Sequence, residues 1–188
     1  MNVTGGAFGL VENGIHFLDL AISLFDCNPR NVFSDLTNLK INPRSKKIDF
    51  YEGTSVWTFD KDRKLTISSS GKSSVSYTAE IFFKNGKIKI NEDLSLSCYF
   101  RKFSEIKKDK RIIRLGKAFK KESYFFKIKK NKLYNKMFGP FLKSKKLNYS
   151  IDRELISTEA MIYSLISNKL SKKIFLKKKY DKYFNYKW

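Results

Sequence analysis

The chain has 188 residues and a formal net charge of +21, and 41% of its residues are hydrophobic, including 17 Phe and 10 Tyr. This apolar and aromatic content argues against a disordered chain, and the length suffices for one domain with a core. The two cysteines, Cys27 and Cys98, form no CxxC pair and have no histidines at metal-ligand spacing, which argues against a zinc site or a disulfide scaffold. No secretory leader opens the chain, and no apolar run approaches the ~20 residues of a membrane-spanning helix. We therefore expect a cytoplasmic protein without a membrane span or a metal site.

The positive charge is concentrated in the second half of the chain. Residues 1–100 carry a net charge of +1, whereas residues 101–188 carry +20, and the chain has 32 Lys against 7 Arg. Such asymmetry is typical of nucleic-acid or membrane-surface binders. However, Lys, Asn, Ile, Phe and Tyr are enriched together and share AT-rich codons, and arginine forks for bases and phosphates are scarce. Nucleic acid is therefore not the expected partner, although a basic nucleic-acid or anionic-surface binder stays an alternative.

The first predicted element is a helix from about Gly14 to Phe25, which ends at the turn sequence "DCNPRN". A run of predicted strands follows, with turn signals every 8–12 residues that indicate an antiparallel meander. The predicted strands are residues 31–39, 48–59, 64–70, 75–83, 87–93 and 94–100.

The rest of the chain is predicted to be helical. Residues 101–150 are basic and lack a clean period, and we expect one or two helical pieces there, such as 121–138 before Gly139-Pro140. A closing helix is predicted at about 152–173, with lysines near its carboxyl end. The order predicts a single α+β domain over residues 1–188, a mostly antiparallel open sheet with helices packed on one face.

A stripe of polar residues lies within the otherwise apolar first helix. His16, the only histidine, and Asp19 and Ser23 are spaced i, i+3 and i+7. If the helix begins one turn before Gly14, Glu12 lies four residues before His16 on the same stripe. Burying such groups unpaired would cost about 1–3 kcal/mol each, so the stripe must face water, hydrogen-bond partners or a ligand. A histidine beside carboxylates is suited to general acid–base chemistry. The alternative is an ordinary hydrogen-bonded core histidine.

The segment "GGAFGLVENGIHFLDLAISLF" resembles the opening of the second domain in the glucose–fructose oxidoreductase/inositol dehydrogenase (Gfo/Idh/MocA) family. The resemblance includes Gly5, Gly6, Gly14 and an H-x-x-D-L run, with Glu12 where the family usually has Asp. The segments "DFYEGTSVWTF", "KLTISSS" and "SYTAEIFFKNGKIKI" are similar to the family's strand series, and "ISTEAMIYSLISNKLSKK" is similar to its closing helix.

The resemblance implies a domain that binds a sugar, sugar derivative or cyclitol and supplies proton-transfer groups for hydride transfer. It implies that His16 and Glu12 are catalytic, with His16 exchanging the substrate hydroxyl proton. It implies that Glu12, Asn13, His16 and Asp19 bind the substrate, with Asp19 mainly supporting the site.

The family's cofactor half is missing from this pattern. "GGAFG" is not G-x-G-x-x-G, no strand is expected before it, and none of Pro29, Pro43 and Pro140 lies in an E-K-P sequence. No cofactor-binding residue is therefore predicted, and the resemblance implies NAD(P) only on a separate Rossmann-domain partner chain. We expect the substrate-binding and catalytic half of an NAD(P)-dependent oxidoreductase, inactive without that partner.

A second alternative is a non-enzymatic binding or oligomerisation module. The sheet face with Ile67, Tyr77 or Trp57 is otherwise expected to be buried against helices, and the Ser/Thr/Lys face to meet solvent or a partner. In the alternative module an open sheet face bearing Trp57 and Tyr77 pairs with another sheet, for example in a homo-oligomer.

Overall fold

The computed structural model describes all residues except 7–8, 40–48, 94, 101–119, 125–150 and 177–188. The chain divides into two compact units, residues 1–80 with 154–188 and residues 81–153. The single domain expected over residues 1–188 stays a prediction. In the described residues the fold is α+β, and strand pairing is antiparallel except for one parallel pair, which confirms the predicted fold class.

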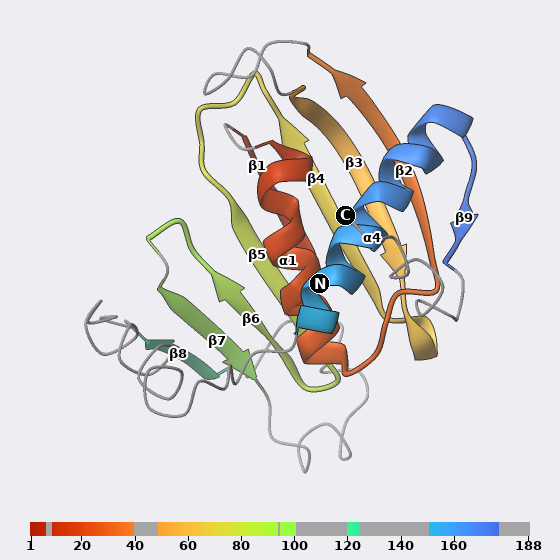
Figure 1. The fold of residues 1–188 in the computed structure, drawn as a ribbon. Helices are drawn as coiled ribbons and strands as arrows, with labels where there is room; N and C mark the ends of the chain where they lie inside the picture. Colours follow the sequence, from red (N-terminus) through yellow and green to blue (C-terminus); the bar gives the residue numbers. More distant parts are fainter. Residues whose placement is uncertain (7–8, 40–48, 94, 101–119, 125–150, 177–188) are drawn as a thin grey trace, which may run out of the picture. The chain divides into compact units, whose positions relative to one another are not determined.

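The first unit is a mixed sheet covered on one face by two helices (Figure 1). Its strands run in the order β5-β1-β4-β3-β2-β9, and β1 pairs parallel to β4 and antiparallel to β5. The strands are β1 Asn2–Gly6, β2 Asn31–Asn38, β3 Tyr51–Thr58, β4 Lys64–Ser70, β5 Thr78–Phe83 and β9 Ile174–Phe175. The helices are α1 Leu10–Phe25 and α4 Ile151–Leu170, and a short 3₁₀ turn, η1 Asp60–Asp62, joins β3 to β4.

The second unit contains an antiparallel ladder of three strands. These are β6 Gly86–Ile90, β7 Leu96–Phe100 and β8 Lys120–Tyr124, with β6 pairing with β7 and β7 with β8. The ammonium of Lys87 lies 5.5 Å from the centre of the Tyr99 ring and 5.8 Å from that of Phe82. The helix expected from residue 121 is wrong for its first residues, because 121–124 pair with β7 as a strand; the rest of that prediction lies outside the described residues.

Helices α1 and α4 meet the sheet through small and apolar side chains. Leu18, Ile67 and Trp57 are fully buried, and each buried side chain of this size contributes roughly 1.5–3 kcal/mol. The indole Nε1 of Trp57 donates to the backbone oxygen of Ala160 at 3.1 Å, so the ring lies beneath α4. The expectation that Trp57 is buried against a helix is confirmed, and the alternative that places it on an open sheet face is wrong.

The face of this sheet opposite the two helices is rich in hydroxyl groups. Strand alternation and register place Thr54, Ser68, Thr4 and Thr78 in one row across β3, β4, β1 and β5. The side-chain oxygens of Thr54 and Ser68 are 2.9 Å apart, and those of Thr4 and Thr78 are 3.5 Å apart. This is the face left for another sheet or for solvent.

The end of α1 is fixed to the turn between β3 and β4 by Arg63. Its guanidinium donates to the backbone oxygens of Phe25 at 2.5 Å and Asp60 at 3.0 Å, and to Cys27 Sγ at 3.1 Å. It also lies 5.4 Å from the centre of the Phe25 ring. One arginine thereby satisfies an end carbonyl of the helix and joins it to the sheet.

The end of α4 protects an edge of β2. Strand β9 pairs with Asn31 and Val32, and beyond them the backbone N–H groups of Ser34 and Leu36 donate to Ser167 Oγ at 3.1 Å and Asn168 Oδ1 at 2.7 Å. Side chains of the helix thus continue the pairing that β9 begins, which blunts an edge strand.

Replacing Ser167 with Ala should lower the free energy of unfolding by about 1–3 kcal/mol, because the buried N–H of Ser34 loses its acceptor and the backbone oxygen of Lys172 loses its donor. Ser164→Ala is the matched control: Ser164 is equally buried, but its hydroxyl donates only within α4, to the backbone oxygen of Met161. Urea unfolding measures both. Equal losses would show that the strand-edge bond contributes nothing specific.

Glu159→Gln should stabilise the protein at neutral pH. Glu159 Oε2 is buried without a hydrogen-bond partner among the described residues, and burial raises the pKa of this carboxyl. A raised folded pKa favours folding below the ordinary pKa of Glu, near 4.3, and this contribution is lost as pH rises through the folded pKa. Urea unfolding should therefore show the variant to be more stable at pH 7, with the difference shrinking towards pH 4. A constant difference at all pH values would contradict this.

Candidate functional site

Helix α1 carries the predicted site and begins earlier than expected. It starts at Leu10 rather than at Gly14, so Glu12 lies inside the helix, one turn before His16. The face towards the sheet is apolar, and its members are all buried: Leu10, Gly14, Phe17, Leu18, Ala21 and Ile22.

The predicted polar stripe lies on the opposite face. His16 and Ser23 are exposed, and Glu12 and Asp19 are half-buried. Asn13, the remaining predicted substrate residue, is also half-buried. The helix thus brings all these side chains to one outward surface, and the alternative of a histidine sealed in the core is wrong.

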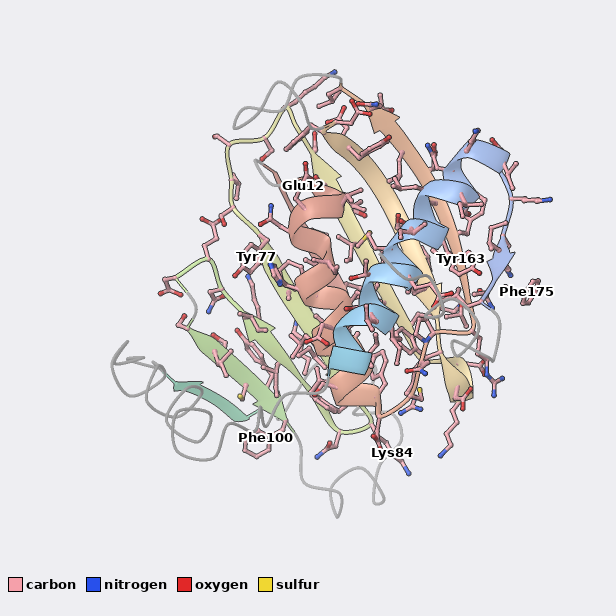
Figure 2. The ribbon with its side chains drawn as sticks, in the orientation of Figure 1. Glu12, Tyr77, Lys84, Phe100, Tyr163 and Phe175 are labelled. Atoms are coloured by element: carbon pink, nitrogen blue, oxygen red, sulfur yellow. The ribbon has the colours of Figure 1, made fainter. Side chains whose placement is uncertain are left out.

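Glu12 takes a defined position at the amino end of α1. It is the third residue of the helix after the N-cap Gly9, and a Cβ added at Gly9 would collide with its carboxylate. Glu12 Oε2 is buried, and a negative charge in the first helical turn is stabilised by the helix dipole. Figure 2 shows Glu12 at this end of the helix.

A strand does precede the glycine-rich turn, contrary to the prediction. Strand β1 ends at Gly6, so the segment is strand, turn and helix, the arrangement that holds phosphates in dinucleotide-binding folds. The space beside the glycines is filled, however. A Cβ at Gly5 would lie 2.6 Å from Tyr77 Cα, and one at Gly6 would collide with Ser73. The Glu12 carboxylate adds a negative charge at the helix terminus, so this turn does not fit the pyrophosphate of NAD(P).

The third glycine of the motif has a packing role. A Cβ at Gly14 would lie 3.4 Å from Ile67 Cδ1 and 3.4 Å from Met161 Cε. Gly14 therefore lies where α1 approaches both β4 and α4.

Tyr77 is a neighbour of the site that the sequence analysis did not include among the site residues. Its ring contacts Phe17 edge-on, with centroids 4.7 Å apart and an interplanar angle of 73°. Figure 2 shows Tyr77 beside α1. Tyr77 is therefore not on an open sheet face. Strand alternation alone cannot reveal this, because Tyr77 precedes the first paired residue of β5.

No three His, Cys, Asp or Glu side chains among the described residues cluster in a way that could hold a metal ion. In the same part of the chain, no helix has the length and apolarity needed to cross a membrane.

No protein-family model matches the chain, and no curated protein matches its sequence. Solved structures do match its fold. An oxidoreductase from Agrobacterium radiobacter, in complex with NAD+, L-tartaric acid and magnesium, superposes with a TM-score of 0.63 at 10% identity, over 93% of this chain and 55% of that one. A protein from Sinorhizobium meliloti described as a myo-inositol dehydrogenase gives 0.59 at 13% identity, over 94% and 56%.

A regulatory protein has the same fold. The super-repressor mutant of Gal80p from Saccharomyces cerevisiae gives a TM-score of 0.64 at 10% identity, over 93% of this chain and 56% of that one. The chain thus spans a little over half the length of these structures. Its fold is that of part of a Gfo/Idh/MocA-type oxidoreductase, which confirms the resemblance expected from the sequence at the level of the fold.

Gly6→Ala and Gly14→Ala should have opposite effects on stability. The first adds a methyl group where Ser73 already lies, whereas the second meets ordinary contact distances. In a helix interior, Ala is also more favourable than Gly by about 0.5–1 kcal/mol. Thermal unfolding should show a lower Tm for Gly6→Ala and an equal or higher Tm for Gly14→Ala. A stable Gly6→Ala variant would contradict the packing assigned to this turn.

Proposed function

We propose that the chain is the substrate-binding and catalytic half of a cytoplasmic NAD(P)-dependent oxidoreductase that acts on a sugar, sugar derivative or cyclitol. The observation that carries the proposal is the outward stripe of α1, where the exposed His16 lies one turn from the Glu12 carboxylate. The shared fold with NAD(P)-dependent oxidoreductases supports it. A separate Rossmann-domain partner holds the cofactor in this proposal.

The residues of α1 divide the work of alcohol oxidation. Oxidation removes a hydride from the carbon of the substrate and a proton from its hydroxyl oxygen, and a nicotinamide on the partner chain supplies the hydride acceptor. The imidazole of His16 accepts the hydroxyl proton as a general base. Glu12, Asn13 and Asp19 bind hydroxyl groups of the substrate and orient it, and Asp19 also supports the site.

Glu12 combines two tasks in this proposal. Its carboxylate lies against Gly9, so its position is fixed by the start of the helix before a substrate arrives. A pre-positioned carboxylate accepts a substrate hydroxyl without first losing side-chain freedom. Because Glu12 binds the substrate in this proposal, His16, one turn further along the helix, is the outward group that accepts the proton.

A second candidate function is a non-enzymatic binding or oligomerisation module. The observation that favours it is the fold similarity to Gal80p, which is described as a transcriptional regulator in Kluyveromyces lactis. Here the hydroxyl-rich sheet face, with exposed Phe33 on β2, would pair with a second copy of the chain.

His16→Ala should lower kcat by about 10²- to 10⁴-fold and leave KM nearly unchanged, because the variant loses the general base but keeps the hydroxyl-binding groups. The assay mixes the full chain with a dinucleotide-binding protein encoded beside it and follows NAD(P)+ reduction with a panel of sugars and cyclitols. Lys169→Ala, an exposed change on α4, is the control. Equal activity of His16→Ala and wild type would overturn the catalytic role.

The same samples separate the two candidate functions. A stable dimer in light scattering, without NAD(P)+ reduction under any pairing and without polyol binding, would favour the non-enzymatic module.

A further inference from the structure

Tyr77 is held beside the polar surface of α1 by its surroundings. Its half-buried ring packs edge-on against Phe17, the residue that follows His16. The buried Phe17 leaves Tyr77 on the flank of the helix rather than beneath it. One edge of the aromatic ring is therefore fixed by the protein, and the residue remains partly accessible.

The glycine pair at the end of β1 positions the backbone that carries Tyr77. The backbone N–H of Gly6 donates to the oxygen of Val75 at 2.8 Å. A Cβ at Gly5 would lie 2.6 Å from Tyr77 Cα and from the backbone oxygen of Ser76. Glycine is thus required at Gly5 and Gly6 to let residues 73–77 cross the end of the strand. The space beside these two glycines is filled by the chain that carries Tyr77, so the glycines position this tyrosine.

Through its contact with Phe17, Tyr77 borders the flank of α1 on which a predicted substrate residue lies. Asn13 precedes Phe17 by four residues, so both side chains lie on the same flank of α1. His16 follows Asn13 by three residues and continues the outward surface. The flank that Tyr77 borders therefore carries one amide and one imidazole of the proposed site.

We propose that Tyr77 is a substrate-binding residue whose ring stacks on the C–H face of a cyclic polyol. This inference rests on the proposed function and deepens it, because it makes a closed ring part of the substrate class. An aromatic side chain offers an apolar face and a polar tip, and ligand sites combine aromatic surfaces with a few placed polar groups. Asn13 and His16 bind hydroxyl groups at the rim of the ring while Tyr77 contacts its apolar face. An open-chain polyol presents no such face and binds more weakly.

The test measures binding of myo-inositol and of sorbitol to the full chain by saturation-transfer NMR. Tyr77→Leu should weaken myo-inositol binding by about 3- to 10-fold, since an aromatic contact is lost. Tyr77→Phe should stay close to wild type, and wild type should prefer the cyclic to the open-chain polyol. Tyr99→Leu changes a half-buried tyrosine of the other compact unit and should have no effect.

The outcomes separate this inference from the proposed function. Equal binding by wild type and Tyr77→Leu would overturn the role of Tyr77 and leave the proposed function standing. Absence of binding by wild type to myo-inositol and to every member of the panel of sugars and cyclitols would overturn both. If Tyr77→Leu does not fold, the alternative sample is deuterated wild-type protein in which only the tyrosines are protonated. Saturation of the tyrosines should then transfer to the C–H protons of myo-inositol. Absence of this transfer would overturn the inference.

Discussion

The close packing of α1 on its sheet is the constraint from which the candidate site follows. Gly14 lies within contact distance of β4 and α4, and Leu18 and Ala21 are fully buried. Burial of this face leaves one direction for the polar residues of the same helix, so the outward position of His16 is a consequence of the core. The Arg63 guanidinium holds the other end of α1, because it donates to the Phe25 carbonyl and also to the Asp60 carbonyl in the turn between β3 and β4.

The elements that the sequence predicted well are those with a strong local pattern. Helix α1, strands β2 to β7 and the closing helix α4 have periodic apolar residues and nearby turn signals, and α4 ends at Leu170, close to the predicted end. Strand β1 has no such pattern, and its pairing with β4 and β5 depends on residues more than 60 positions away. The hydrogen-bond partner of Trp57 was equally hidden, since it is Ala160 of α4, 103 residues further on.

The candidate site shows the same division between local and distant information. The helical spacing alone predicted that Glu12, His16 and Asp19 share a face, and the structure confirms it. The contact of Phe17 with Tyr77 joins residues 60 positions apart and could not be predicted. The glycines show that a sequence pattern does not fix the role of its residues. At Gly5 and Gly6 the neighbouring chain fills the space that a phosphate would need. The fold is nevertheless shared with an oxidoreductase solved in complex with NAD+.

The central claim is that the imidazole of His16 faces outward from α1, and chemical modification tests it directly. Because the chain has a single histidine, the ultraviolet absorbance of the carbethoxyhistidine that diethyl pyrocarbonate forms reports on this side chain alone. The native protein should be modified nearly as fast as the chain unfolded in urea. Strong protection of the native protein, released only on unfolding, would contradict the account.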